Sequence, residues 1–202
     1  MALWLAARPL VLASKSKIRR ALLTAAGIPV DVHPAELDER AAEANAPANE
    51  PSAIAAHLAR EKALLVSRSH PGRLVLGADQ VLALEGRCFA KPPDHAAARA
   101  QLRSLAGRTH ALHAAVACVA NGSIAFEDVG VARLTMRMFS EQFLDAYLET
   151  AGEAATESVG AYQLEGLGSQ LFERVEGDYF TILGLPLLEV LEFLRRQGCL
   201  LP

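Results

Sequence analysis

Hydroxyl groups and positive charges are concentrated in one short stretch near the start of the chain, residues 13–23. It follows the apolar run 9–12, which predicts the first strand of a buried sheet. It leads into an apolar-periodic segment that predicts a helix capped by Ser16. The first N–H groups of a helix are unpaired, and the helix dipole favours an anion there. A strand-to-helix turn with two serines and four cations therefore predicts phosphate binding.

Helical periodicity separates the cations of this stretch. A spacing of about 100° per residue gives one apolar arc, formed by Ile18, Leu22, Ala25 and Ala26 and extended by Leu23. Arg19 falls inside the extended arc, whereas Lys17 and Arg20 point away from it. A guanidinium directed toward a core-facing cleft needs an anion, because an unpaired buried charge is costly. We therefore expect Arg19 to be functional and Lys17 and Arg20 to be solvated; a wholly solvated basic helix start is the alternative.

Two polar residues interrupt the strongest predicted strand, residues 73–84. The run is otherwise apolar on both faces, as in a central strand that is covered on both sides. Asp79 and Gln80 lie in its middle, one on each face. A buried carboxylate is costly unless it is paired, protonated or bound to a metal. Pairing with an arginine is one explanation for Asp79; the one we favour is a function at a strand end that opens onto a cleft.

Two lysines and a second carboxylate complete the set of candidates. Lys62 lies on a shoulder of the apolar face of a predicted helix, residues 51–68, and one alternative is that its ammonium reaches solvent. Pro92 holds Lys91 in an extended conformation that suits ligand contact, although an ordinary loop lysine has the same pattern. Glu39 lies in a polar loop. Such cations and carboxylates, without a Cys–His or Ser–His pattern, a P-loop or GxGxxG, suit metal-assisted phosphoryl chemistry.

The bulk composition narrows the class of protein. The chain has 202 residues and is 51% hydrophobic, so we expect one domain over residues 1–202. The net charge of −3 argues against binding of nucleic-acid polymers. Its three cysteines are far apart and form no zinc or disulfide pattern, which fits a reducing cytoplasm. Residues 1–12 are apolar but too short to span a bilayer, so we expect a cytoplasmic protein without a signal peptide or membrane contact.

The remaining elements predict an α/β fold with a mixed sheet, because strands and helices alternate early and a long hairpin follows. Further strands are predicted at 28–33, 109–120, 123–138, 171–175 and 180–183, and further helices at 95–105, 141–149 and 184–197. Residues 41–50 lack periodicity and predict a mobile loop, and the glycine-rich residues 158–168 predict a ligand-shaping loop or simply tight turns. His110 and His113 lie on opposite faces of their strand, so they are predicted to be polar edge residues and not a metal pair.

Over residues 10–194, the sequence resembles the Maf family of nucleoside-triphosphate pyrophosphatases, because it has the family's motifs in the same order. The motifs that carry the resemblance are Leu12-Ala-Ser14-x-Ser16-x-x-Arg19, Asp38-Glu39, Glu61-Lys62-Ala63, Gly77-Ala-Asp79-Gln80-Val81, Lys91-Pro92, Gly107-Arg108-x-His110, Gly160-Ala-Tyr162 and Gly184-Leu-Pro186. Each motif is weak alone, but the ordered set is specific. The resemblance implies a Maf/ITPase-like fold, in which a mixed, elongated β-sheet is flanked by helices in two lobes with the active-site cleft between them.

The resemblance also implies a reaction. A divalent metal, Mg²⁺ or Mn²⁺, and the cations would hold a nucleoside triphosphate, and water would cleave it between the α and β phosphates to a monophosphate and pyrophosphate. Asp79 matches the family's proposed base, and Asp79 with Glu39 would assist metal binding. Arg19, Lys62 and Lys91 match phosphate-contacting cations, and Ser14 matches a hydroxyl that contacts the substrate. A homodimer is a further expectation.

Substrate choice in the family tracks three positions, matched here by Ile18, Gln80 and Glu165. Members acting on dTTP and UTP resemble one another in having Arg, Thr and Gln there, whereas the 7-methyl-GTP subgroup has an aromatic residue, Gln and Glu. Two of three positions follow the second subgroup, and the carboxylate of Glu165 suits the donor edge of guanine. Ile18 departs from the pattern because it cannot stack on a purine as an aromatic ring does, and Lys17 replaces the usual proline. We therefore expect 7-methyl-GTP, with dTTP or UTP as the near alternative.

The family is also linked with inhibition of septum formation. A nucleotide-binding regulator of septum formation with little catalysis is therefore the alternative from a different functional class.

Overall fold

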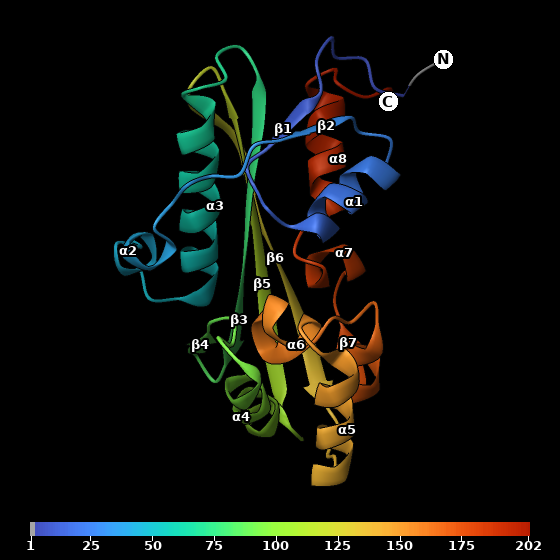
Figure 1. The fold of residues 1–202 in the computed structure, drawn as a ribbon. Helices are drawn as coiled ribbons and strands as arrows, with labels where there is room; N and C mark the ends of the chain where they lie inside the picture. Colours follow the sequence, from blue (N-terminus) through green and yellow to red (C-terminus); the bar gives the residue numbers. More distant parts are fainter. Residues whose placement is uncertain (1–2) are drawn as a thin grey trace.

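A mixed β-sheet runs the length of the molecule in the computed structural model, which describes residues 3–202 (Figure 1). Residues 1 and 2, which belong to the apolar N-terminal segment, lie outside the described residues. Seven strands pair in the order β2-β1-β3-β5-β6-β7, with β4 beside β3. Their bounds are β1 Leu10–Leu12, β2 Val30–Val32, β3 Leu74–Leu84, β4 Arg87–Phe89, β5 Thr109–Ala120, β6 Ser123–Met136 and β7 Phe172–Glu176.

The pairing of the strands is parallel at one edge and antiparallel elsewhere. Strand β1 is parallel to both β2 and β3, whereas β3–β5, β5–β6, β6–β7 and β3–β4 are antiparallel. The long β5–β6 hairpin turns at Asn121 and Gly122, which both have positive φ, of 51° and 77°, as a tight hairpin turn requires. The α/β fold with a mixed sheet flanked by helices is confirmed.

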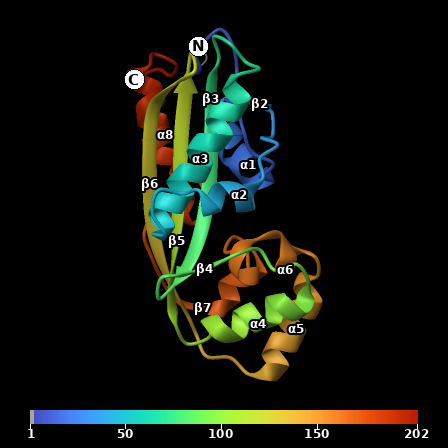
Figure 2. The ribbon, with the colours of Figure 1, turned by 90° about the vertical axis from the view of Figure 1, so that its left-hand side faces the viewer.

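The helices gather in two groups along the sheet (Figures 1 and 2). In one group, α1 (Lys17–Ala25) and α8 (Leu187–Arg196) cover one face and α3 (Pro51–Ser67) covers the other, with α2 (Glu39–Ala44) beside α3. The second group lies toward the other end of the sheet and is formed by α4 (His95–Leu105), α5 (Glu141–Ala151) and α6 (Ala154–Glu157). Two 3₁₀ turns, Val159–Ala161 and Leu167–Leu171, and helix α7 (Tyr179–Ile182) complete the chain.

Alternation along β3 assigns its side chains to the two covered faces, since successive residues of a strand point to opposite sides. Leu76 and Ala78 pack with α1 and α8, and Leu82 packs with α4 and α5. Val81 packs with α3 on the opposite face. Strand β3 therefore carries polar side chains into two different environments at Asp79 and Gln80.

Two predicted elements are wrong. Residues 180–183, predicted to be a strand, belong largely to helix α7, because Asp178 caps it by accepting a hydrogen bond from the Thr181 N–H at 2.7 Å. Part of the predicted loop 41–50 is helix α2, which Asp38 caps through the Ala41 N–H at 3.1 Å. The segment is rich in alanine and buries only Ala42, so its sequence shows no amphipathic pattern.

The prediction that His110 and His113 are polar edge residues is also wrong, because β5 lies between β3 and β6. His110 is 1% exposed and lies inside the second helical group, because the segment that follows α6 covers this end of β5. His113 is half-buried and shares a hydrogen bond of 2.7 Å with the hydroxyl of Ser52. Among residues 3–202, no helix is both long and apolar enough to cross a membrane.

Candidate active site

The edge of β3 that faces β1 is open over a short stretch. Strand β1 pairs with β3 only as far as Leu76, and β4 pairs with it only from Leu82 onward. In the part of the chain that the structure describes, residues 77–81 therefore have a strand partner only on the β5 side. Asp79 and Gln80 lie in the middle of β3, as predicted, but the strand does not end at Asp79, so the interpretation of a strand end opening onto a cleft is wrong. The interruption of the sheet beside them comes from the neighbouring strands β1 and β4, which pair with β3 only before and after this stretch.

Arg19 occupies this open edge. Its Nε donates to the carbonyl of Gly184 at 2.8 Å, and its Nη1 donates to the carbonyl of Ala78 at 2.8 Å and to the hydroxyl of Ser14 at 3.1 Å. Burial lowers the pKa of Arg19 below its ordinary value, while the negative charges of Asp79 and Glu39 raise it. The guanidinium therefore joins α1, β3 and the turn before α8, and remains close to two carboxylates.

The predicted inward orientation of Arg19 is confirmed, and so is the solvent exposure of Lys17 and Arg20. The cap at Ser16 is also confirmed, since its hydroxyl accepts from the Arg19 N–H at 3.3 Å. The apolar arc is narrower than predicted, because Leu23 alone is fully buried on α1.

On the α3 face, a lysine bridges two carboxylates. Lys62 Nζ lies 2.5 Å from Asp79 Oδ1 and 2.7 Å from Glu39 Oε1. Lys62 and Asp79 are buried, whereas most of the Glu39 side chain is exposed. The alternatives of a solvent-directed Lys62 and of an arginine paired with Asp79 are therefore wrong. Burial raises the pKa of Glu39, but the hydrogen bond and charge of Lys62, with the charges of Lys91 and Arg19, bring it below its ordinary value.

A glycine permits this bridge. A Cβ added to Gly77 would lie 2.1 Å from the carbonyl oxygen of Ala59 and 2.7 Å from the amide nitrogen of Ala63. Backbone atoms of α3 therefore press directly on β3, one turn before Lys62. Because Asp79 is two residues after Gly77, it lies on the same face. The close helix–strand approach brings the Lys62 ammonium to the Asp79 carboxylate.

Gln80 belongs to the opposite face of β3, as predicted. Its Nε2 donates to the carbonyls of Thr181 at 3.1 Å and Ile182 at 2.9 Å, which fixes the amide against α7. Ile18 is half-buried at the start of α1, and Glu165 is exposed between the two 3₁₀ turns. Lys91 is also exposed, in the segment between β4 and α4. The structure thus brings together Ser14, Arg19, Glu39, Lys62 and Asp79, with Gln80 across the strand.

Residues 9–197 match the family described as Maf-like protein. The chain belongs to the Maf family. It is similar to curated proteins named "Nucleoside triphosphate pyrophosphatase". One from Rhodopseudomonas palustris is 58% identical over 200 residues, with 99% of each chain covered. One from Bradyrhizobium diazoefficiens is 56% identical over 197 residues, with 98% of each covered, and one from Nitrobacter winogradskyi is 54% identical over 200 residues, with 99% of each covered.

Sequence reasoning missed the backbone groups that hold the Maf site together. The carbonyls of Ala78 and Gly184 anchor Arg19, and those of Thr181 and Ile182 anchor Gln80. One signal was available, since Gly184 belongs to the Gly-Leu-Pro motif and has φ of 87°, in the left-handed region that favours glycine. The turn at Gly184 therefore aims a carbonyl at Arg19.

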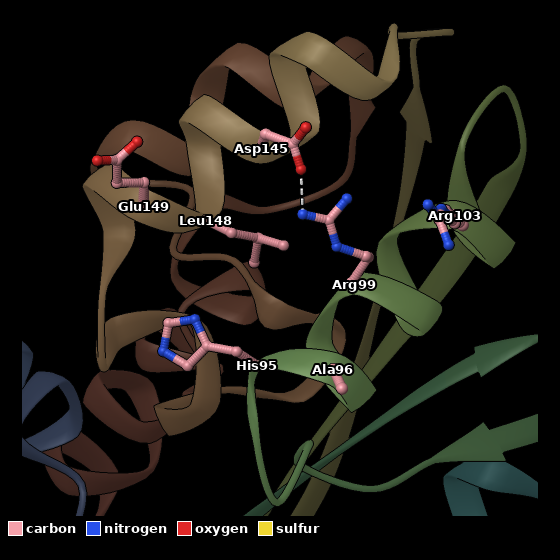
Figure 3. A pocket seen from close by; sticks show the side chains of 7 residues that line it. All are labelled: His95, Ala96, Arg99, Arg103, Asp145, Leu148 and Glu149. Carbon is pink, nitrogen blue, oxygen red and sulfur yellow. Dashed lines mark hydrogen bonds and ion pairs between the residues drawn. The ribbon is translucent and has the colours of Figure 1, made fainter.

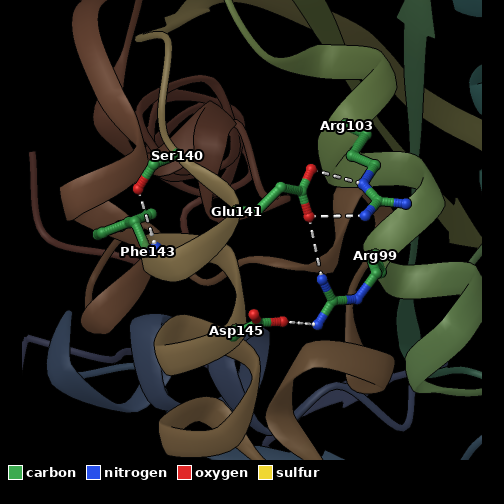
Figure 4. Close-up of polar contacts among 6 residues, drawn as sticks. All are labelled: Arg99, Arg103, Ser140, Glu141, Phe143 and Asp145. Carbon is green, nitrogen blue, oxygen red and sulfur yellow. Dashed lines mark hydrogen bonds and ion pairs between the residues drawn. The ribbon is translucent and has the colours of Figure 1, made fainter.

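Two described pockets of this Maf protein lie away from these side chains. One, of about 550 Å³, opens between α4 and α5 and is lined by His95, Ala96, Arg99, Arg103, Asp145, Leu148 and Glu149 (Figure 3). There Arg99 pairs with Asp145 and Glu141, and Arg103 with Glu141 at 2.6 Å (Figure 4). These exposed ion pairs join two helices.

The second pocket, of about 310 Å³, lies beside β5 and includes His110 and His113 in its lining. It contains none of the predicted site residues. Among residues 3–202, no three His, Cys, Asp or Glu side chains converge as a complete metal site.

Proposed function

We propose that the protein is a nucleoside triphosphate pyrophosphatase that cleaves the α–β phosphoanhydride of 7-methyl-GTP. The products would be 7-methyl-GMP and pyrophosphate. The observation that carries the proposal is the buried Lys62–Asp79 pair at 2.5 Å, with Glu39 on one side and Arg19 on the open edge of β3. Cations and carboxylates side by side suit hydrolysis of a polyphosphate, which needs charge neutralisation and an activated water. The names of the similar proteins support pyrophosphate release from a nucleoside triphosphate.

The donor set fits a divalent metal. Mg²⁺ is commonly held by one or two carboxylates together with substrate phosphates and water, so a complete protein cage is not needed. Asp79 and Glu39 supply two carboxylates whose oxygens lie 2.5 Å and 2.7 Å from the same ammonium group, and are therefore close to each other. They would hold Mg²⁺ or Mn²⁺, which supplies electrophilic stabilisation of the phosphoryl oxygens when bound.

The residues of the chain then have distinct tasks. Asp79 accepts the proton of the attacking water. Arg19, Lys62 and Lys91 neutralise the triphosphate, and Ser14 donates its hydroxyl to a phosphate oxygen. The second Nη of Arg19 makes no hydrogen bond with residues 3–202, so it remains available to donate to the substrate while the rest of the guanidinium is anchored.

The preference for a guanine nucleobase is argued from hydrogen-bond acceptors of the protein. Gln80 Nε2 is occupied by two carbonyls of α7, and its Oε1 accepts no hydrogen bond from the described residues. Gln80 Oε1 and the Glu165 carboxylate are therefore both available as acceptors. Guanine offers N1–H and an exocyclic amine as donors, whereas thymine and uracil offer a single N3–H. A carboxylate also favours the positive charge of the 7-methylated base.

A panel of nucleotides tests the proposal. Pyrophosphate release with Mg²⁺ or Mn²⁺ is measured for 7-methyl-GTP, GTP, dTTP and UTP. We expect the highest kcat/KM for 7-methyl-GTP. Release from dTTP but not from 7-methyl-GTP would overturn the assignment in favour of a dTTP/UTP pyrophosphatase.

Replacement of Arg19 by alanine is expected to raise KM and lower kcat, by about 2–4 kcal/mol in kcat/KM. The substitution removes a charge from the triphosphate and also releases the carbonyls of Ala78 and Gly184. Arg19→Lys should recover little, because one ammonium cannot span both carbonyls as the planar guanidinium does. Arg20→Ala is the matched control, since Arg20 is exposed on the same helix and makes no ion pair with the described residues. A large effect at Arg20 would contradict the choice of arginine.

A further inference from the structure

A short buried segment that precedes Glu165 has an unusual backbone. Gly160 and Ala161 both have positive φ, of 80° and 61°. Ala161 is fully buried, and an alanine in the left-handed region is strained. Such strain persists only where the surroundings determine the conformation, and it is common at functional sites. The contacts that hold residues 160 and 161 in this conformation therefore indicate which function the strain serves.

Four hydrogen bonds hold the segment from three different elements and from its own start. They join Gly160 N to Gln101 Oε1 at 3.2 Å, Tyr147 Oη to the Ala161 carbonyl at 3.0 Å, Ser158 Oγ to the Tyr162 carbonyl at 2.6 Å, and His110 Nε2 to Tyr162 Oη at 2.7 Å. The first three anchor backbone groups of the segment. Only the last reaches from the sheet to a side chain of the segment.

The bond between His110 and Tyr162 is deeply buried. The two residues are 1% and 5% exposed, and the ring of Phe172 packs against both, with centroids 5.9 Å from His110 and 4.8 Å from Tyr162. Burial lowers the pKa of His110 to about 4, so the ring is neutral at neutral pH. His110 Nδ1 is buried without a hydrogen-bond partner in the described residues. Two apolar side chains here would avoid the cost of a buried nitrogen without a partner. The His110–Tyr162 hydrogen bond therefore contributes more to the orientation of the segment than to the stability of the fold.

The anchored segment lies on the face of β3 that carries Gln80. A Cβ added to Gly160 would lie 2.6 Å from Cδ1 of Leu82, so the segment touches β3 there. Leu82 is two residues after Gln80 and therefore points to the same side. The segment thus lies on the Gln80 side of β3 and contacts the strand two residues after Gln80.

The residues that follow form a compact loop. Gly166 N donates to the carbonyl of Gln163 at 3.2 Å, and a Cβ on Gly168 would lie 2.5 Å from the same oxygen. This loop, residues 163–168, carries the exposed Glu165. Because it is closed on itself and begins directly after Tyr162, the position of Tyr162 fixes one end of it.

We propose that His110 and Tyr162 are a positioning pair, whose hydrogen bond fixes loop 163–168 so that Glu165 meets the base of the nucleotide. This inference rests on the proposed function, in which Glu165 accepts from guanine. Neither residue of the pair lies among the cations and carboxylates that handle the phosphates. The pair therefore governs base selection and not phosphate chemistry.

The first test is Tyr162→Phe, which deletes the hydroxyl and keeps the ring against Phe172. We expect KM for 7-methyl-GTP to rise and its preference over dTTP to fall, each roughly tenfold, the size of one hydrogen bond, with kcat nearly unchanged. Val190→Ala is the control, because Val190 is a fully buried residue of α8 that is not part of the loop or its anchors. It should lower thermal stability and leave the preference unchanged.

A double variant separates positioning from stability. Tyr162→Phe leaves His110 Nε2 unpaired in the core, whereas His110→Leu with Tyr162→Phe removes both polar partners, so thermal stability should recover. The base preference should remain low in the double variant. A preference that returns together with stability would show a merely structural role and overturn the proposal.

Glu165→Ala tests the route of the effect. If Tyr162 acts through Glu165, Tyr162→Phe should not change the preference further in the Glu165→Ala protein. Additive losses would overturn the proposal.

The preference is also measured as the Kd ratio of 7-methyl-GMP to dTMP, which needs no turnover. A wild-type protein that releases no pyrophosphate from any triphosphate defeats the proposed function, whereas an unchanged Kd ratio in Tyr162→Phe defeats the positioning pair.

Discussion

Asp79→Asn is expected to reduce pyrophosphate release by ~10²–10⁴-fold while the nucleotide still binds. Asparagine keeps the shape of the side chain but cannot accept the proton of water, and it contributes no charge to a divalent metal. The substitution does not leave Lys62 unpaired, because Glu39 lies 2.7 Å from the ammonium. The three cations that we propose contact the phosphates, Arg19, Lys62 and Lys91, are unchanged by the substitution. Loss of turnover should therefore be separable from loss of binding.

Two measurements check this expectation on the same preparation: pyrophosphate release with Mg²⁺ or Mn²⁺, and calorimetric titration with the nucleotide. The matched control is Glu141→Gln, also a change from carboxylate to amide within an ion-pair network, since Glu141 contacts Arg99 and Arg103 between α4 and α5. It should retain wild-type turnover. Unchanged turnover in Asp79→Asn would show that Asp79 is not the base. A wild-type protein that binds nucleotide without releasing pyrophosphate would instead favour the nucleotide-binding regulator.

Local periodicity predicted how the main side chains point. The two-residue repeat of a strand placed Asp79 and Gln80 on opposite faces, and the structure has Asp79 against α3 and Gln80 against α7. The helical repeat directed Arg19 inward, and its guanidinium reaches the carbonyl of Ala78. These predictions succeed because each depends on the geometry of one element. The same reasoning predicted the class of fold from the order of elements.

Contacts between distant elements were not predictable in this way. The open edge of β3 exists because β1 spans only Leu10–Leu12 and pairs in the register Val11–Val75. The register between two separate strands cannot be predicted from either segment alone. Glu39 reaches Lys62 from a helix too rich in alanine to show a periodicity. His110 is buried by Tyr162 and Phe172, which lie more than fifty residues further along the chain. Competing local signals account for α7, where an apolar run suggested a strand although Asp178 caps a helix.

Gly77→Ala is expected to lower the free energy of unfolding by about 3 kcal/mol or more, the upper end for an overpacked core. The new Cβ would lie 2.1 Å from the Ala59 carbonyl oxygen and 2.7 Å from the Ala63 amide nitrogen. Both are backbone atoms of α3, so no side-chain rotation relieves the overlap and the helix must move away from β3. For a chain of this size, such a loss corresponds to a fall in Tm of roughly 6–12 °C.

The same displacement should also reduce turnover, because Lys62 is on α3 and Asp79 is on β3, two residues after Gly77. A separation of the two would break the 2.5 Å pair and leave Asp79 buried without its cation. Thermal unfolding and pyrophosphate release measure the two effects.

Ala63→Gly added to Gly77→Ala should restore neither the stability nor the turnover, since the contacts with backbone atoms of α3 remain. Gly166→Ala is the control for stability, because its nearest contact is 3.9 Å away and its φ is −131°. Wild-type Tm and turnover in Gly77→Ala would contradict the direct contact of α3 with β3, and with it the physical reason why Lys62 reaches Asp79.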